Sequence, residues 1–408
     1  MKSKPFKPVL ANLCAEAEQL GKPAWRPVLQ YVAELHGRSI LAPTPPFEHA
    51  WEEIGPGYCG SPCFGHWDIV HQILDTVPAE PVHARNQMLN NLASQLKNGF
   101  LPGTIWMRGG KPKFKTHAGH PPVWPFGAEQ IFQRKRDLEF LRTCYDALLR
   151  QIGWFNRKRK THDGGFYYLD ICGDKVWESG IDDGIRFRKI ITGPSAMVDA
   201  TSHVYAMHQT AALWAERLKE DPAKYAAEAA RLETLIQTRM FDDKIGLFQD
   251  AWRVDNNSES VLASEGIWPV VVGAATQEQA MRVIDENLLN PERFFTKHPI
   301  PSVGASDPLF ELRLWCGPTW NSLTYWAATG CMRYGRADAA RKLLAAALDQ
   351  VTKQFRETGT IWEFYHPHGG HPTECERKPY TKHNAPCLNY LGHNPLLAMA
   401  RLWQAATK

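Results

Sequence analysis

The sequence predicts an all-α protein, an (α/α)6 barrel or a close variant, in which helical hairpins form a toroid and long aromatic loops lie over one mouth. Pairs of segments with apolar residues three and four positions apart alternate with segments rich in Pro, Gly and aromatic residues. At least five of the intervening loops are unusually long for a compact domain, where loops over about 15 residues are uncommon unless they are functional. A toroid explains both observations, because each hairpin buries its apolar face against its neighbours. The pattern does not by itself count six hairpins.

The expected elements follow one another along the chain with little β-alternation, which is confined to the loops. Helical segments are expected within 1–40 (one or two helices) and at 68–74, 84–97, 127–158, 198–217, 222–240, 261–271, 276–288, 318–334, 337–355 and 395–406. Long loops are expected at 41–67, 100–124, 161–193, 241–259, 289–315 and 356–389. No low-complexity linker or charge block divides the chain, so we expect one barrel domain over 1–408, with 1–66 supplying N-terminal helices and a loop that lead into it.

Composition narrows the function classes. The net charge of +4, from 47 basic and 43 acidic residues, gives no reason to expect nucleic acid or an anionic membrane as a partner. No segment approaches the roughly 20 apolar residues of a membrane span, and the N-terminus lacks the apolar run of a signal peptide. The nine cysteines are scattered and odd in number. We therefore expect a cytoplasmic protein. No glycine-rich loop stands between a strand and a helix, so no nucleotide or other cofactor is expected.

Two loop carboxylates are the strongest candidates for catalysis. The stretch WESGIDDGIRF, residues 177–187, combines an aromatic, glycines, carboxylates and an arginine without hydrophobic periodicity. Asp182 in this stretch is the expected catalytic acid, because ionisable loop residues on a large scaffold commonly carry function. Its expected partner is Glu363 in GTIWEFYHPHGG, where aromatic neighbours desolvate the carboxylate. Fifteen tryptophans, many in polar loops, suit a site that stacks sugar rings.

ESGIDDGIRF resembles the E-S-G-x-D-x-S-x-R-F loop of the inverting α-glycosidases of glycoside hydrolase family 63 and the related trehalases of family 37. Eight further blocks resemble those of the family in order: GHWDIV, HPPVWPF, MVDATSHVYAMH, IGLFQD, EGIWPVVVG, IPSVGASDPLF, LWCGPTWNSLTYW and IWEFYHPHGG. The resemblance spans about residues 67 to 400. This sequence departs from the family pattern at three places: LGHNPL replaces the closing F-G-W-S, Cys316 stands in place of an arginine, and Asp183 replaces an amide.

The resemblance implies Asp182 as general acid, Glu363 as general base and Asp68 as a ligand of sugar hydroxyls. An inverting glycosidase needs this pair of carboxyls on opposite sides of the scissile bond. The complete expected set of substrate-binding residues is Trp67, Asp68, His120, Trp124, Gly180, Arg186, Trp315, Trp320, Trp362 and His393. The expected substrate is a small α-glucoside or α-mannoside, either a glycosyl osmolyte such as glucosyl- or mannosylglycerate or a trehalose-like disaccharide.

Several alternatives stay open at the level of sequence. Asp183 competes with Asp182 as the acid, and Glu374 or Glu376 would follow if Glu363 were only an exposed loop residue. The histidines and cysteines of residues 366–387 have donor atoms for zinc, but their spacing fits no known finger or HExxH pattern, so no metal is expected. The histidines are instead expected to contact a polar or acidic group of the substrate. Competing functions are a sugar epimerase or isomerase that uses histidines on the same toroid, and a non-catalytic carbohydrate-binding toroid.

Overall fold

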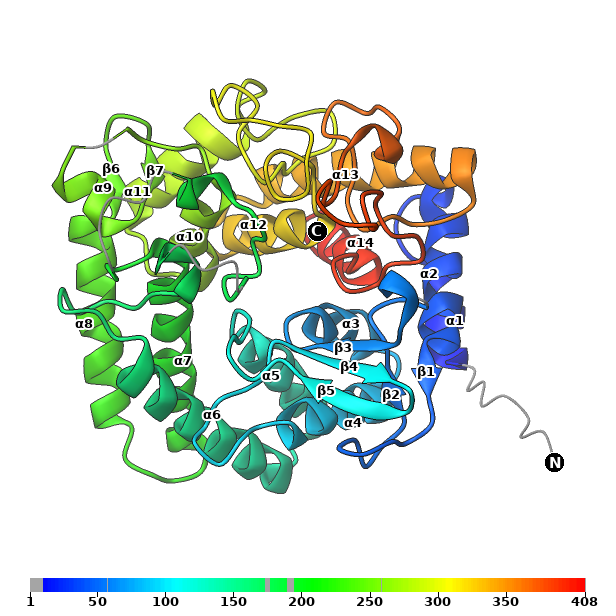
Figure 1. Ribbon diagram of the computed structural model, residues 1–408, viewed down its shortest axis with the longest axis horizontal. Coiled ribbons are helices and arrows are strands. Elements are labelled where there is room, and N and C mark those ends of the chain that lie inside the picture. The colour runs from blue at the N-terminus through cyan, green and yellow to red at the C-terminus, as the bar shows by residue number, and fades with distance from the viewer. Residues whose placement is uncertain (1–9, 57, 173–176, 189–193, 258, 408) are drawn as a thin grey trace.

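The protein is described by a computed structural model that covers residues 10–56, 58–172, 177–188, 194–257 and 259–407. Its helices form an (α/α)6 barrel, which confirms the predicted fold class (Figure 1). The inner helices are α3 (Asp68–Thr76), α5 (Trp124–Lys135), α7 (Val198–Arg217), α10 (Trp268–Val272), α12 (Asn321–Arg333) and α14 (Leu396–Ala405). The outer helices are α4 (Pro81–Ala93), α6 (Leu138–Lys158), α8 (Ala223–Arg239), α11 (Gln277–Arg282), which continues as a π-helix over Val283–Leu288, α13 (Ala337–Thr358) and α2 (Arg26–Arg38).

The two ends of the chain close the ring. The C-terminal helix α14 packs on α2 and also on α3, the first inner helix, so that the last hairpin pairs segments from opposite ends of the sequence (Figure 1). The short helix α1 (Ala11–Ala17) packs on α2. Residues before position 66 are therefore part of the ring as well as a lead into it.

Local sequence explains where the helices begin and end. Helix α7 spans the predicted range 198–217, and its buried face carries Val204, Met207 and Ala211. The prediction of a single helix over 127–158 is wrong, because the structure has two. Arg136 adopts a left-handed conformation with φ of 52°, and the Asp137 side chain accepts hydrogen bonds from the first backbone N–H groups of α6. A capping carboxylate of this kind starts a new helix even where the apolar pattern runs on.

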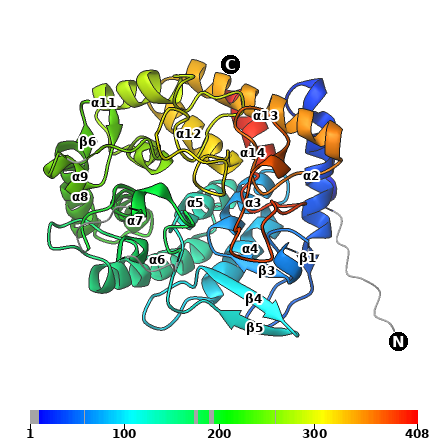
Figure 2. The same cartoon turned by 45° about the horizontal axis from the view of Figure 1, so that its top comes forward.

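Among the residues that the structure describes, strands occur only as short pieces in the loops. They are β1 (Ile40–Leu41), β2 (Trp51–Glu52), β3 (Cys63–Gly65), β4 (Thr104–Arg108), β5 (Lys111–Phe114), β6 (Phe241–Asp242) and β7 (Leu247–Phe248); a short helix, α9 (Ala251–Asp255), follows β7. The antiparallel sheet β3-β4-β5 lies beside α3 and α4 (Figure 2). Long loops precede α3, α5, α7, α12 and α14, so the N-terminal ends of these inner helices share one mouth of the ring with the loops. None of the helices in the described part of the chain is long and apolar enough to cross a membrane.

A buried ionic cluster ties α2 to α3 and to strand β2. His36 Nδ1 lies 2.5 Å from Glu52 Oε1, and His36 Nε2 lies 3.3 Å from Asp75 Oδ2. His83 on α4 contacts the other Glu52 oxygen at 2.9 Å. Burial alone would lower the pKa of His36, but Glu52 and Asp75 overcome this effect and raise it to about 9. The imidazolium therefore contributes to stability in the neutral pH range.

Candidate active site

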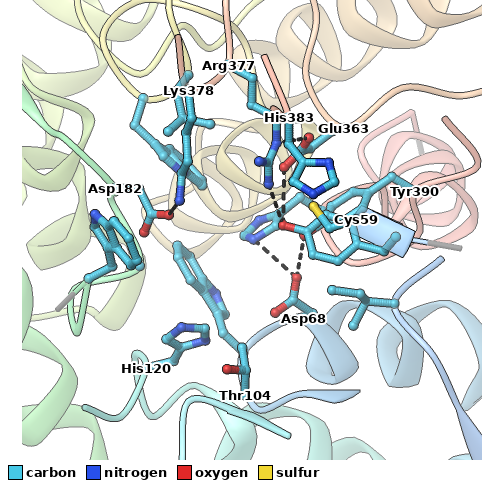
Figure 3. A pocket seen from close by; sticks show the side chains of 18 of the residues that line it. Cys59, Asp68, Thr104, His120, Asp182, Glu363, Arg377, Lys378, His383 and Tyr390 are labelled. Atoms are coloured by element: carbon cyan, nitrogen blue, oxygen red, sulfur yellow. Dashed lines mark hydrogen bonds and ion pairs between the residues drawn. The ribbon is translucent and has the colours of Figure 1, made fainter. Parts of the chain in front are cut away.

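A cavity of about 310 Å³ opens at the mouth where the loops gather (Figure 3). This volume is at the lower end of the roughly 300–1,000 Å³ typical of small-molecule sites. It is lined by nine of the residues expected from sequence: Trp67, Asp68, His120, Gly180, Asp182, Trp315, Trp320, Glu363 and His393. Residues from remote parts of the chain, including Tyr58, Lys115, Trp177, Arg377, Lys378 and Tyr390, complete the wall. The predicted acid and base therefore lie in the same cavity.

The loop that carries Asp182 is held from beneath by buried polar contacts. Glu178 forms an ion pair with Arg159 at 2.7 Å, and the Ser179 backbone N–H donates to Asp170 at 2.7 Å. Gly180 has φ of +74°, and a Cβ atom there would lie 2.2 Å from Cζ3 of Trp67. Only glycine fits this close approach without displacing the indole. The loop is thereby fixed against the wall of the cavity before Asp182 emerges.

Asp182 faces the cavity next to a cluster of cations. Its Oδ2 atom lies 2.6 Å from Lys378 Nζ, and its side chain is 22% exposed (Figure 3). The same ammonium group lies 4.0 Å from the centre of the Trp177 ring, and Lys115 Nζ lies 5.6 Å from it. Burial lowers the pKa of Lys115, although Asp182 and Asp170 oppose the shift. Asp182 thus lies on a side of the cavity where its charged neighbours Lys378 and Lys115 are basic.

Glu363 occupies a very different setting on the opposite side of the cavity (Figure 3). Its side chain is 2% exposed. Oε2 accepts hydrogen bonds from Arg377 Nε at 2.7 Å and from the Cys387 backbone N–H at 3.0 Å. The Tyr58 hydroxyl lies 3.4 Å from Oε1 and itself accepts a hydrogen bond from Arg377. Glu363 thus forms a buried, charge-assisted pair with a guanidinium and also accepts from a backbone donor.

Asp68, at the start of α3, is a third carboxyl in the cavity. The Tyr390 hydroxyl donates to its Oδ1 atom at 2.6 Å, and His393 Nε2 lies 3.6 Å from the same oxygen. Burial raises the pKa of Asp68 to about 6, although the Tyr390 hydrogen bond opposes the shift. Gly65 and Gly392 lie so close that a Cβ at either position would contact the carboxyl group within 2.4 Å. Two backbone segments therefore clamp Asp68 in one orientation.

Three tryptophans form a stacked wall beside Asp68. The rings of Trp67 and Trp315 are nearly parallel with centres 5.8 Å apart, and those of Trp315 and Trp320 stack at 3.8 Å. The His393 ring meets all three edge-on. Burial holds the pKa of His393 well below its usual value, so this imidazole is neutral. The result is a rigid apolar surface with carboxylates at its margin, which suits a sugar ring.

A pair of thiols lies directly behind Glu363. Cys59 Sγ and Cys387 Sγ are 4.0 Å apart, and both belong to loops that contact the carboxylate. The hydrogen bond with Cys387, assisted by Arg377, lowers the pKa of Cys59 to about 7 against the opposing effect of burial. Cys59 lines the cavity, so its thiolate is accessible from the site.

Comparison with known proteins identifies the family. Residues 62–381 match the model of the mannosylglycerate hydrolase MGH1-like glycoside hydrolase domain. The chain belongs to this family. The mannosylglycerate hydrolase of Rubrobacter radiotolerans is 25% identical over an alignment that covers 79% of this chain and 90% of that protein. A mannosylglycerate hydrolase of Thermus thermophilus is 31% identical over 144 residues, and this match spans about a third, 34%, of each chain.

A solved relative shares the whole fold. The family 63 mannosylglycerate hydrolase from Thermus thermophilus, in complex with glucose, superimposes with a TM-score of 0.71 at 20% identity and covers 92% of this chain and 99% of that one. The predicted kinship with family 63 is confirmed. The protein is a glycoside hydrolase.

Three predicted substrate-binding residues of this glycoside hydrolase lie outside the cavity lining. Arg186 is 2% exposed and contacts Asp199, Asp250 and Glu265 at 3.0, 3.1 and 3.3 Å, so it braces the loops behind Asp182. Buried Trp124 begins α5 and donates to Gln151 at 2.7 Å, in the core between helices. Trp362 packs on His371 and donates to Thr358. Each of these three side chains has partners within the protein, and its contact with a substrate stays a prediction.

The histidine-rich loop is also more dispersed than its sequence suggests. Of its four histidines, His383 lines the cavity, whereas His366 lies 3.8 Å from Glu374 and His368 packs on Phe310. Across the residues that the structure describes, no three His, Cys, Asp or Glu side chains converge as a group that would hold a metal ion. Asp183, the neighbour of Asp182, contacts Arg313 and Tyr380. It therefore links two loops.

Sequence reasoning missed several residues that surround the carboxyls. Arg377, Lys378 and Tyr390 each contact one of the three cavity carboxyls, and Tyr58 and Lys115 complete the wall. They lie in loops and short turns without periodicity, so no sequence pattern predicts where their side chains point. The one available signal for Arg377 and Lys378 was their position in the same long loop as the histidines, 14 and 15 residues after Glu363.

Proposed function

We propose that this glycoside hydrolase cleaves a small α-glycoside with inversion, using Asp182 as general acid and Glu363 as general base. The observation that carries the proposal is the contrast between the two carboxyls on opposite sides of one cavity (Figure 3). Glu363 is buried and forms an ion pair with Arg377. Asp182 is partly exposed and receives no backbone hydrogen bond among the described residues. A base must start ionised, whereas an acid must be able to take up a proton.

Glu363 would deprotonate a water molecule that attacks the anomeric carbon, while Asp182 protonates the glycosidic oxygen. The new C1–O bond forms on the face opposite the breaking bond, so the configuration inverts. This mechanism requires carboxyls about 6.5–9.5 Å apart, with space for the water between them. The position of Asp182 and Glu363 on facing walls supports that arrangement.

The cleaved sugar would occupy the space between the tryptophan wall and Asp68. Indole faces stack on the C–H face of a pyranose, and Asp68 accepts hydrogen bonds from its hydroxyls. Trp67 Nε1 and His120 Nδ1 are buried atoms of cavity residues that have no hydrogen-bond partner among the described residues. A buried polar group without a partner costs about 1–3 kcal/mol. Neither atom is exposed to the cavity, so each would pair with a sugar hydroxyl only after its ring turns.

The aglycone would lie beyond Asp182, on the basic side of the cavity. Lys115 and Lys378 line this part of the wall beside Trp177. Cations at a leaving-group site favour an acidic aglycone such as glycerate. The relatives known as mannosylglycerate hydrolases support the same substrate class. We therefore propose a glycosylglycerate, with either mannose or glucose as the sugar, ahead of a neutral disaccharide of the trehalose type.

Activity on a panel of mannosylglycerate, glucosylglycerate and trehalose tests the proposal. Asp182→Asn and Glu363→Gln are each expected to reduce kcat by about 10²–10⁴, the usual contribution of one acid or base. Asp183→Asn, next to the acid, and Glu374→Gln, in the loop of the base, serve as matched controls and are expected to retain most of the activity. Retention of wild-type turnover by either Asp182→Asn or Glu363→Gln would remove that residue from the mechanism. Sugar interconversion without cleavage would favour an epimerase.

A further inference from the structure

Asp182 forms a contact that conflicts with its proposed role. An acid must carry a proton before it can donate one, yet Asp182 Oδ2 lies 2.6 Å from Lys378 Nζ. The Asp182 and Lys378 side chains are partly buried, with exposed fractions of 22% and 12%. An opposite charge at this distance favours the ionised form of a carboxyl. The contact therefore opposes protonation of the acid until Lys378 is drawn away.

The Lys378 ammonium group also contacts an aromatic ring, which would keep it in the cavity when it leaves Asp182. Nζ stands 4.0 Å from the centre of the Trp177 ring, next to Lys115 on the same ring. The ring can therefore retain the cation as it shifts. The backbone around Lys378 is held on both sides, because Arg377 N–H donates to the Asn384 carbonyl and Thr381 N–H donates to the Lys378 carbonyl. A rotation of the long lysine side chain is then sufficient to separate it from Asp182.

The charged groups around Asp182 determine which kind of ligand can draw Lys378 away from it. Six titratable groups lie close enough to Asp182 to affect its charge. They are Lys115, Lys378, Asp68, Asp170, Asp183 and Tyr380. Burial raises the pKa of Asp170 to about 7 and that of Asp68 to about 6, so both carry little negative charge in mildly acidic solution. Asp183 is engaged with Arg313 and Tyr380. No ion pair to Lys115 is present among the described side chains, so the two lysines leave an excess of positive charge beside the acid.

We propose that Lys378 is a specificity-determining residue that couples proton uptake by Asp182 to the binding of an anionic aglycone. The carboxylate of the bound aglycone takes the Lys378 ammonium group as its ion-pair partner and releases Asp182. Asp182 then accepts a proton from solvent and passes it to the glycosidic oxygen as the C1–O bond breaks. Glu363 accepts the proton of the attacking water as the new C1–O bond forms. A neutral aglycone leaves Lys378 on Asp182, and the acid stays ionised.

This inference rests on the proposed function and is tested with two substrates that differ only in charge. Glucosylglycerate carries a carboxylate where glucosylglycerol carries a CH₂OH group. Steady-state kinetics and the pH dependence of kcat/KM are measured for both substrates with the wild-type enzyme and with three variants. Lys378→Met removes the charge and keeps the length of the side chain. Lys378→Arg keeps the charge, and Lys115→Met removes the neighbouring cation that does not contact Asp182.

The wild type is expected to prefer glucosylglycerate by at least about tenfold in kcat/KM, because an ion pair disfavours the protonated acid by that factor or more. Lys378→Met is expected to raise kcat on glucosylglycerol by about tenfold and to extend activity on it to higher pH, since the acid is no longer paired. Lys378→Arg should keep the wild-type preference. Lys115→Met should raise the KM for glucosylglycerate without any gain on glucosylglycerol.

Each alternative has a distinct signature. If Lys378 only binds the aglycone, Lys378→Met will lose activity on glucosylglycerate and gain none on glucosylglycerol, and the proposal is wrong. Equal wild-type activity on the two substrates would also overturn it, while leaving the glycosidase assignment intact. Hydrolysis of neither these glycosides nor the rest of the panel would instead overturn the proposed function itself. A general folding defect in Lys378→Met would lower activity on both substrates alike and equally at every pH, so the pH profile of kcat/KM on glucosylglycerol then decides: an unshifted profile overturns the proposal.

Discussion

Replacement of Arg377 by methionine tests the setting of the proposed base. The guanidinium Nε atom lies 2.7 Å from Glu363 Oε2, and the two side chains are 6% and 2% exposed. Loss of one partner of a buried pair costs about 3–5 kcal/mol, because the other charge stays buried without compensation. The remaining backbone donor, the Cys387 N–H at 3.0 Å, restores only part of this stabilisation. We expect Arg377→Met to lower the free energy of unfolding by about 3–5 kcal/mol at pH 8.

The same variant should change the pH dependence of both stability and catalysis. Glu363 without its counter-charge ionises less readily, so the acidic limb of kcat/KM should move to higher pH. The destabilisation should shrink as the pH falls, because the buried carboxyl can then take up a proton. Urea titrations at several pH values and pH–rate profiles measure the two effects.

A surface arginine provides the matched control. Arg336 forms ion pairs with Asp285 at 2.7 Å and Asp338 at 2.9 Å, but these carboxylates are more than half exposed. Arg336→Met should therefore cost no more than about 1 kcal/mol, as for other exposed pairs. If Arg377→Met costs as little as Arg336→Met and leaves the acidic limb of kcat/KM unchanged, the argument that Arg377 keeps the base ionised is refuted.

Local geometry supports three further predictions. Gly180→Ala should reduce activity and lower the free energy of unfolding by about 1–3 kcal/mol, because the added Cβ would overpack the site at 2.2 Å from Trp67. The control is Gly109→Ala, which is also at positive φ but in open space and should leave activity unchanged. The pKa of His36 is raised to about 9 in the folded protein, above its unfolded value, so its stabilising contribution is fully present below about pH 6.5 and is lost as the pH rises through 9; His36→Gln should lack this slope in urea titrations. Iodoacetamide at pH 7 should alkylate Cys59, whose pKa is lowered to about 7, and inactivate the enzyme by blocking the cavity; mass spectrometry locates the adduct, and substrate protection with resistance of Cys59→Ser is expected. Unchanged activity after full alkylation of Cys59 would contradict this last prediction.

The helices could be predicted from the sequence because their apolar residues recur at a regular spacing. The range 198–217 was predicted as a helix and is one, since the apolar spacing there has no competing cap. The range 127–158 was mispredicted as one helix because a capping aspartate, Asp137, interrupts a pattern that otherwise continues. Closure of the ring by α2 and α14 depends on contacts between the two ends of the chain, which no local pattern encodes.

Part of the cavity lining could be predicted from the order of the sequence motifs. Nine predicted residues line it, because the motifs mark loop positions that precede the inner helices. Arg186 shares the motif with Asp182, but the direction of its side chain depends on Asp199, Asp250 and Glu265, which lie far along the chain. The pairing of Lys378 with Asp182 spans 196 residues and leaves no trace in either local sequence. Side-chain direction in loops is thus the part that sequence alone does not provide.

The configuration of the released sugar tests the central claim most directly. Proton NMR of glucosylglycerate or mannosylglycerate hydrolysis, recorded within the first minutes before mutarotation, distinguishes the anomeric protons of the two products. If Glu363 activates water opposite the bond that Asp182 protonates, the β-anomer should appear first and the α-anomer should grow in only as the sugar mutarotates. Initial release of the α-anomer would contradict the assignment of Asp182 and Glu363 as an inverting acid–base pair.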